Sequence, residues 1–122
     1  MILGLKTNDR MAEIWVDGTR HEWESGREMA QKLLGKIVGL LPEGDVHKIS
    51  GVVLYQGEGS FTGLRIGATI ANTLADALGV PIVGEGGEDW YAAGVSRLRN
   101  GENQKRVLPE YGRGANITKP RK

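Results

Sequence analysis

The chain has 122 residues, of which 39% are hydrophobic, and this size and composition suit one packed domain. It contains no cysteine, which excludes disulfide frameworks, thiolate metal sites and cysteine nucleophiles and fits a reducing compartment. The formal net charge is only +1, and no apolar run approaches the roughly 20 residues that a membrane-spanning helix needs, so we expect a cytoplasmic protein with no membrane partner.

The first 24 residues are predicted to form three antiparallel strands. Residues 1–7 and 11–16 are mostly apolar runs separated by a short polar turn. Asp17-Gly18 favours a two-residue hairpin turn whose geometry matches the strand twist, so residues 20–24 return as the third strand.

A first helix is expected after these strands. Ser25 and Glu28 are spaced as a capping box, in which each side chain accepts a hydrogen bond from a backbone N–H group at a helix start. Apolar residues recur at helical spacing over 29–41, and Pro42 ends the pattern.

The second half of the chain alternates strands and helices. Residues 51–55 are a continuous apolar run, as in a strand covered on both faces, and residues 62–78 predict a second helix closed by Gly79. A buried strand over 80–83 and a helix over 87–99 follow. This order of elements is that of the ribonuclease-H-like half domain of actin-like ATPases and sugar kinases. We therefore expect an α/β fold with a mixed five-stranded sheet and flanking helices.

The domain is predicted to cover residues 1–99, and residues 100–122 are predicted to form an extended basic tail. The basic residues in and near the tail are Arg97, Arg99, Lys105, Arg106, Arg113, Lys119, Arg121 and Lys122, opposed there by Glu102 and Glu110. Such a tail can bind RNA through its phosphate groups, or it can be a solvated segment that aids solubility.

The predicted second helix has two apolar stripes. Gly63, Gly67, Ala71 and Ala75 are small and recur at every fourth position, which lets another helix approach closely. The other stripe consists of Ile66, Ile70, Leu74 and Ala77. One stripe can face the sheet, and the other can then meet a helix of the same chain or of a partner. The predicted partner interface comprises Gly63, Leu64, Gly67, Ala68, Ala71 and Ala75, together with Leu33 and Ile37 of the first helix.

A Gly-rich turn, residues 56–60, lies between a strand and a helix start, where free N–H groups attract anions. It can be a phosphate site, although it lacks the P-loop ending and Glu58 would repel a phosphate. Alternatively, Ser60 or Thr62 is an ordinary N-cap and the glycines supply the freedom for the turn. Arg65 opposes the helix dipole, so we expect it to have a specific partner such as a carboxylate.

No catalytic, cofactor-binding or metal-binding residue is predicted. His21 and His47 lack a metal-ligand spacing. Glu85, Glu88 and Asp89 form an acidic cluster that can bind a divalent cation, or the latter two can stabilise the start of the third helix through its dipole.

Residues 57–67 carry the most specific pattern of the chain. They read Gly-Glu-Gly-Ser-Phe-Thr-Gly-Leu-Arg-Ile-Gly and closely resemble the Gly-Pro-Gly-Ser-Phe-Thr-Gly-Leu-Arg-Ile-Gly signature of the TsaB (YeaZ) family. The resemblance continues over 71–75 and 78–84, and more loosely back to the first strand. The residues of this signature loop are Gly57, Gly59, Ser60, Phe61, Thr62 and Arg65.

The resemblance implies a non-catalytic subunit that supports the enzyme TsaD in making threonylcarbamoyladenosine in transfer RNA. Family members pair through their first two helices with TsaD or with themselves, and TsaE is a further member of the complex as its accessory ATPase. The resemblance implies no cofactor for this chain, with ATP or ADP only in the assembled complex. A contact between the basic tail and tRNA would fit this role.

Two departures from the family pattern bear on function. The first strand of the family usually ends Asp-Thr-Ser, but here the residues are Lys6, Thr7 and Asn8, so a cation replaces the carboxylate that related ATPases use near metal and phosphate. Usual members also carry a second domain of similar fold, so this chain resembles a short single-domain form. The alternative function is a nucleotide- or phosphate-binding single lobe of a sugar-kinase-like enzyme that uses the Gly-rich turn.

Overall fold

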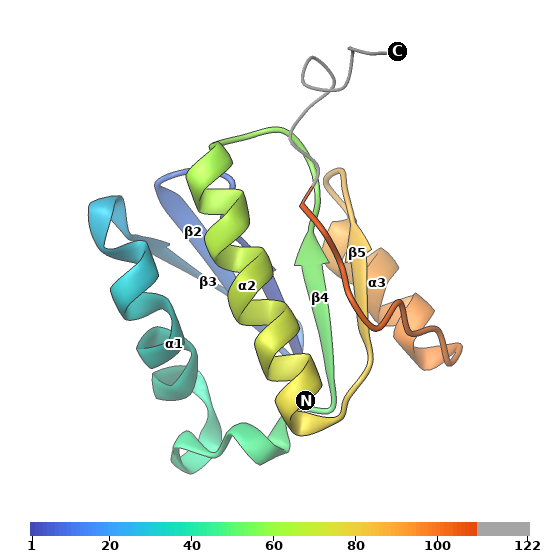
Figure 1. The fold of residues 1–122 in the computed structure, drawn as a ribbon. Helices are drawn as coiled ribbons and strands as arrows, with labels where there is room; N and C mark the ends of the chain where they lie inside the picture. Colours follow the sequence, from blue (N-terminus) through green and yellow to red (C-terminus); the bar gives the residue numbers. More distant parts are fainter. Residues whose placement is uncertain (110–122) are drawn as a thin grey trace, which may run out of the picture.

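The computed structural model describes residues 1–109, which form one mixed five-stranded sheet with helices on both faces (Figure 1). The strands are β1 (Ile2–Lys6), β2 (Met11–Val16), β3 (Thr19–Glu24), β4 (Gly51–Tyr55) and β5 (Ile82–Glu85), in the spatial order β3-β2-β1-β4-β5. β1, β2 and β3 are successively antiparallel, whereas β4 lies parallel to β1 and β5 parallel to β4. The predicted meander and the predicted α/β class with a mixed sheet are confirmed.

Three helices cover the sheet. α1 (Met29–Leu40) and α2 (Phe61–Leu78) lie on one face, and α3 (Trp90–Arg99) lies on the other (Figure 1). Short 3-10 turns occur at Gly26–Glu28, Pro42–Gly44 and Val46–Lys48. None of the helices in residues 1–109 is long and apolar enough to cross a membrane.

The central strands are buried on both faces, which explains their continuous apolar runs. Leu3, Val52 and Ile82 lie side by side in neighbouring strands and join the larger core cluster beneath α1 and α2. The next residues along two of these strands, Val53 and Val83, point to the opposite face. They pack there against the aromatic residues of α3 in a second cluster of Val53, Val83, Trp90 and Tyr91.

The ends of α2 are set by local chemistry that the sequence shows. The Ser60 hydroxyl accepts a hydrogen bond from the Gly63 N–H group at 3.2 Å, so Ser60 is the N-cap. Gly79 closes the helix in the left-handed conformation (φ 67°), and its N–H group bonds to the carbonyl oxygens of Ala75 and Asp76. The predicted C-cap is confirmed.

The predicted capping box at the start of α1 is wrong. Ser25 is buried, and its hydroxyl donates to the Arg10 carbonyl oxygen at 2.9 Å instead of accepting from the helix. Glu28 instead forms an ion pair with Lys32 at 3.0 Å on the helix surface. A 3-10 turn therefore precedes α1, which begins at Met29.

Two other predicted boundaries are shifted along the chain. β5 covers Ile82–Glu85 rather than 80–83, because its register is set by pairing with β4, where Val52 lies opposite Ile82. α3 begins at Trp90 rather than at residue 87, since Gly87 has a φ of +84°, outside the helical region.

Residues 103–109, which we call the C-terminal strap, pack along the free edge of β5. The Gln104 N–H group donates to the Ile82 carbonyl oxygen at 2.9 Å, and its side-chain oxygen accepts from the Gly84 N–H group at 2.7 Å. Val107 is only 1% exposed and belongs to the core cluster. The strap thus covers an edge that would otherwise expose unpaired backbone groups.

The strap is the part of the predicted basic tail that the structure describes. Figure 1 shows it, in orange to red, passing beside β5 and returning toward α2. The rest of the predicted tail, residues 110–122, lies outside the described residues.

Candidate functional site

The eight residues predicted to form a partner interface lie in the core of the chain itself. Their positions are Leu33, Ile37, Gly63, Leu64, Gly67, Ala68, Ala71 and Ala75, and all are buried. The small-residue stripe of α2 therefore faces the chain's own sheet rather than a partner helix. As an exposed interface, this set of residues is wrong.

The reason is a close approach between α2 and the end of β1. The buried Thr7 hydroxyl donates to the Gly63 carbonyl oxygen at 2.8 Å. A Cβ atom at Gly63 would collide with the Thr7 carbonyl oxygen, and one at Gly67 would collide with the Thr7 hydroxyl. The glycines are needed at this contact within the chain.

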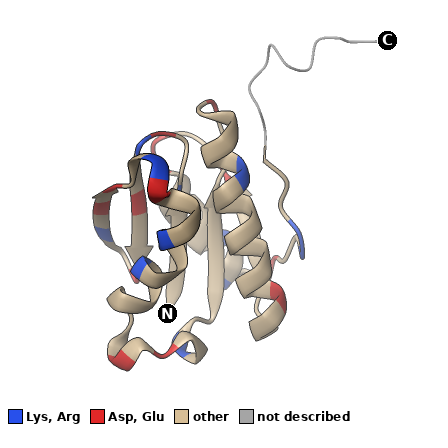
Figure 2. Cartoon of the chain, turned by 60° about the vertical axis from the view of Figure 1, so that its left-hand side comes forward, with Lys and Arg blue, Asp and Glu red and all other residues tan. Residues whose placement is uncertain are grey.

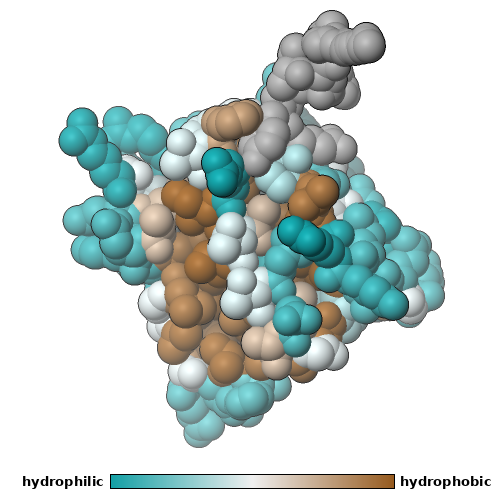
Figure 3. All heavy atoms as spheres, viewed as in Figure 1, coloured by the Kyte–Doolittle hydropathy of each residue, from teal (hydrophilic) through white to brown (hydrophobic). Residues whose placement is uncertain are grey.

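A different surface of α1 and α2 is exposed. A groove of about 360 Å³ runs between the two helices. It is lined by Ala30 of α1 and by Phe61, Thr62, Arg65, Ile66, Thr69 and Ile70 of α2. Phe61 is 57% exposed and Leu34, one turn after Ala30, is 45% exposed. Figure 3 shows a hydrophobic strip between the two helices. We call this surface the helix groove.

The second apolar stripe of α2 could have identified the helix groove from the sequence. Ile66 and Ile70 belong to that stripe, and both line the groove while their inner atoms pack on the core. On α1, Ala30 and Leu34 are spaced four residues apart and so share one side of the helix. Both stripes can be seen in the sequence, but the small-residue stripe, which was expected at a partner interface, is the buried one.

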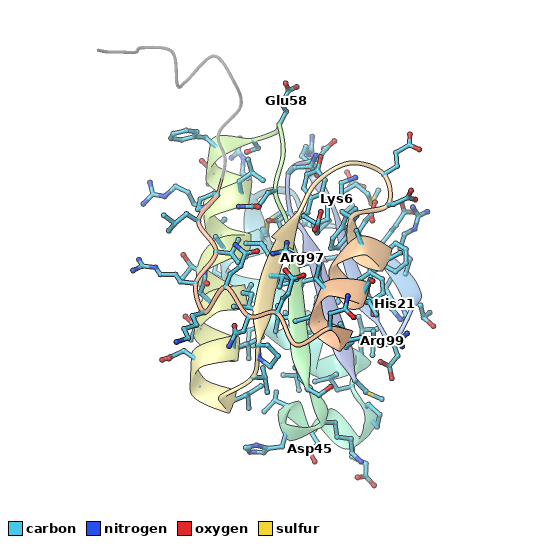
Figure 4. The ribbon with its side chains drawn as sticks, turned by 90° about the vertical axis from the view of Figure 1, so that its right-hand side faces the viewer. Lys6, His21, Asp45, Glu58, Arg97 and Arg99 are labelled. Carbon is cyan, nitrogen blue, oxygen red and sulfur yellow. The ribbon has the colours of Figure 1, made fainter. Side chains whose placement is uncertain are left out.

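The signature loop is held by the chain's own groups. The Ser60 N–H group donates to the Asn8 carbonyl oxygen at 2.8 Å, and the Asn8 side-chain amide donates to the Glu58 carbonyl oxygen at 3.2 Å. Gly59 lies so close to Asn8 that a Cβ atom there would collide with it. The Glu58 side chain projects away from the domain at the tip of the loop (Figure 4). Two N–H groups of the suggested phosphate site, those of Gln56 and Ser60, are thus already bonded to the carbonyl oxygens of Glu85 and Asn8.

Lys6, at the position where the family resemblance implies a carboxylate, lies in an ion-pair network. Its Nζ atom is 3.8 Å from a carboxylate oxygen of Glu13 and 4.8 Å from the ring centre of Tyr55. Glu13 also accepts from the Trp15 indole at 3.0 Å and lies 3.7 Å from the Arg20 guanidinium. Lys6 therefore serves as a structural cation on the face of the sheet that carries α3.

A second network ties α3 to β5 and to the turn after α3. Arg97 lies 3.0 Å from Glu85 and 2.8 Å from Glu102, and Figure 4 shows it near the centre of this side of the molecule. The hydrogen bond to Glu102, with a contribution from Glu85, raises the pKa of Arg97. Glu85 is thus paired within the chain. Residues 1–109 contain no group of three His, Cys, Asp or Glu side chains that could hold a metal ion.

Arg65 is the signature residue whose predicted partner the structure does not supply. It is exposed on α2, and within the described residues it has no hydrogen bond or ion pair. It lines both the helix groove and a second hollow beside the strap. Among residues 1–109, no carboxylate lines either hollow.

The chain is similar to a known protein family and to solved structures. A family model described as "TsaD: tRNA N6-adenosine threonylcarbamoyltransferase" matches residues 24–96, more than half of the chain. Two similar crystal structures are YeaZ from Pseudomonas aeruginosa and an uncharacterized protein with similarity to peptidase YeaZ from Pseudomonas aeruginosa. Each is 27% identical to this chain, with TM-scores of 0.61 and 0.59 respectively. No protein of curated function matches the chain.

The two structures confirm the resemblance to YeaZ (TsaB) and the actin-like ATPase type of fold. Each alignment covers 70% of this chain and 42% of the solved one. The chain therefore spans about two fifths of the length of the structures it matches.

Proposed function

This chain belongs to the TsaD family of tRNA N6-adenosine threonylcarbamoyltransferases, and we propose that it is a non-catalytic subunit that supports a TsaD-type enzyme. The reaction supported is the formation of threonylcarbamoyladenosine in transfer RNA, in the cytoplasm. In this role the chain binds no cofactor itself, ATP or ADP enters only with the assembled complex, and a TsaE-type ATPase is a further member of that complex.

The observation that carries the proposal is the helix groove. Apolar side chains such as Ile66 and Ile70 line it together with polar ones such as Thr62 and Arg65, and the exposed Leu34 lies on α1 one turn after the lining residue Ala30. Contiguous exposed apolar patches rimmed by polar residues are typical of protein interfaces. A helix from a partner can lie along α1 and α2 with its own apolar side in the groove.

The position of Lys6 supports the non-catalytic role. Phosphoryl transfer in related ATPases relies on a carboxylate near metal and phosphate, whereas this chain has an ammonium group there. That ammonium is paired with Glu13 and stacked near Tyr55, so it is part of the packing of the sheet. The chemistry then belongs to the TsaD-type partner.

Co-purification with the TsaD of the same organism tests the proposal. Leu34→Lys places a charge in the helix groove at a site where it meets no other lysine at i±3 or i±4. Met11→Lys is a matched control, because Met11 is 43% exposed and lies on β2 facing away from α1. We expect Leu34→Lys to weaken binding to TsaD by about tenfold or more, as for a central interface residue. Met11→Lys should bind as the unmodified chain does.

Two results would contradict this assignment. One is a chain that binds no TsaD at micromolar concentration, and the other is equal loss of binding in the two variants. Light scattering on the chain alone measures whether it forms a homodimer. If the chain forms a homodimer through the helix groove and does not bind TsaD, the groove is a self-association surface and the proposed complex with TsaD is wrong.

A further inference from the structure

A second hollow lies on the other side of α2, between the helix and the C-terminal strap. It encloses about 420 Å³ and is lined from both sides. The lining residues are Arg65, Ala68, Thr69, Asn72 and Thr73 of α2, and Arg106, Val107, Leu108 and Pro109 of the strap. We call it the strap groove.

The strap wall of this groove is fixed by hydrogen bonds. The Asn72 amide donates to the Val107 carbonyl oxygen at 2.7 Å, and its oxygen accepts from the Val107 N–H group at 2.8 Å. The Gln56 side-chain amide donates a hydrogen bond to the Leu108 carbonyl oxygen at 2.7 Å. Because both backbone groups of Val107 are bound to α2, the neighbouring Arg106 is anchored beside that helix.

The groove is strongly cationic. Arg65 lies on the α2 wall and Arg106 on the strap wall, both are exposed, and neither has a hydrogen bond or ion pair within residues 1–109. Thr69 and Thr73 follow Arg65 at successive fourth positions, so two hydroxyl groups continue its line along the helix. Among residues 1–109, no carboxylate and no aromatic side chain lines the groove.

The acidic residue of α2 lies elsewhere. In the sequence of α2, Arg65 lies near the start and Asp76 near the end, and Figure 2 shows basic and acidic colouring on this helix. Asp76 lines a neighbouring hollow together with Lys105 rather than the strap groove. Arg65 lies early in α2, where the positive end of the helix dipole disfavours a cation, so a bound anion would relieve that repulsion.

We propose that the strap groove binds the phosphodiester backbone of RNA, with Arg65 and Arg106 on the phosphates and the threonine hydroxyls as further donors. Guanidinium groups bind phosphate oxygens strongly, and backbone N–H, Ser and Thr donors commonly accompany them. The sequence beyond Pro109 continues with Arg113, Lys119, Arg121 and Lys122 against a single Glu110, which favours an extended polyanion over a small anion. The groove binds the phosphodiester backbone of the RNA and makes no base-specific contacts.

This inference deepens the proposed function, because the RNA would then be the transfer RNA on which the TsaD-type partner acts. It also makes its own prediction. Binding should depend on phosphate contacts and not on base sequence, since the described lining residues include no aromatic side chain on which a base could stack.

The test measures binding of the full chain to an unmodified tRNA transcript by fluorescence anisotropy at several KCl concentrations. Arg65→Gln and Arg106→Gln should each lower affinity about tenfold or more, as expected for losing a charge-assisted hydrogen bond. Each should also reduce the slope of log K against log salt by about 1, because one phosphate contact is lost. Arg99→Gln is the matched control, since Arg99 is an exposed arginine of α3 on the opposite face of the sheet. It should leave the slope unchanged.

Three outcomes would overturn the inference. The first is that the two groove variants behave as Arg99→Gln does. The second is that Arg65→Gln and Arg106→Gln weaken binding of inorganic phosphate while tRNA binding is unchanged, which would indicate a site for a free anion. The third is that Arg106→Gln weakens TsaD binding while RNA binding is unchanged, which would assign the groove to an acidic protein surface.

Failure of this inference is distinguishable from failure of the proposed function. The salt slope is measured without TsaD, and the Leu34→Lys comparison is measured without RNA. A chain that binds tRNA through the groove but never binds TsaD would retain this inference and lose the proposed function.

Discussion

Asn72→Ala should detach the C-terminal strap from α2. The Asn72 side chain makes both hydrogen bonds to the backbone of Val107, at 2.7 and 2.8 Å, and a third to the Ala68 carbonyl oxygen at 2.7 Å. Alanine removes all three while keeping α2 helical. The backbone groups of Val107, a residue only 1% exposed, then lose their partners.

The expected loss of stability is about 2–3 kcal/mol. If the strap stays in place, two neutral hydrogen bonds are worth about 2 kcal/mol, and the buried groups left unsatisfied add about 1 kcal/mol or more. The higher helix propensity of alanine offsets about 0.6 kcal/mol of this loss in the free energy of unfolding. If the strap instead leaves, the chain loses the burial of the Val107 side chain, about 1.5–3 kcal/mol. Both routes lead to a similar value.

Urea denaturation measures this loss, and amide hydrogen exchange locates it. For a domain of this size the melting temperature should fall by about 10 °C. Faster exchange should be concentrated at the Gln104 and Val107 N–H groups, which bond to β5 and to Asn72. Thr73→Ala is the control, because Thr73 is the exposed neighbour on the same helix and should change stability by no more than about 0.5 kcal/mol. Equal stability of the two variants would refute the role of Asn72 as the anchor of the strap.

Two further predictions concern other parts of the fold. Gly35→Ala should stabilise the chain by about 1 kcal/mol, since Gly35 lies within α1 with open space at its Cβ position, whereas Gly67→Ala should destabilise it by about 1–3 kcal/mol through collision with Thr7. Urea midpoints with the same sign in both variants would contradict the placement of the two glycines. Burial raises the pKa of Tyr91, with Asp17 adding to the effect, so the neutral phenol is favoured in the folded state. The contribution of Tyr91 to the free energy of unfolding should therefore be fully present below the unfolded pKa of about 10 and be lost as the pH rises above it. In Tyr91→Phe, the free energy of unfolding should fall less between pH 9 and 11.

Much of the fold could be predicted because its signals are local. The Asp17-Gly18 turn, the continuous apolar run of β4, and the caps of α2 at Ser60 and Gly79 each depend on a few adjacent residues. Ser25 and Glu28 show the limit of such local reasoning. Their spacing matches a capping box, but a distant acceptor, the Arg10 carbonyl oxygen, takes the Ser25 hydroxyl.

The candidate site was predicted only in part. The sequence indicated that α2 has two apolar stripes and that one of them can face the sheet, which agrees with the buried residues of α2 in the structure. It did not indicate which stripe faces the sheet. That choice depends on Thr7, which is far from α2 in the sequence and approaches so closely that only glycine fits at Gly63 and Gly67.

The amino-acid sequence alone determined the order of the elements, the ends of α2 and the resemblance to the YeaZ family, because periodicity, caps and a signature motif are properties of neighbouring residues. Only the tertiary structure decided which residues reach the surface. It turned the small residues of α2 inward, left Leu34 exposed and Ile66 and Ile70 half-buried in the wall of the helix groove, and bound the strap to Asn72 and β5. These outcomes depend on contacts between distant segments, where close packing and the pairing of buried backbone groups override the local pattern.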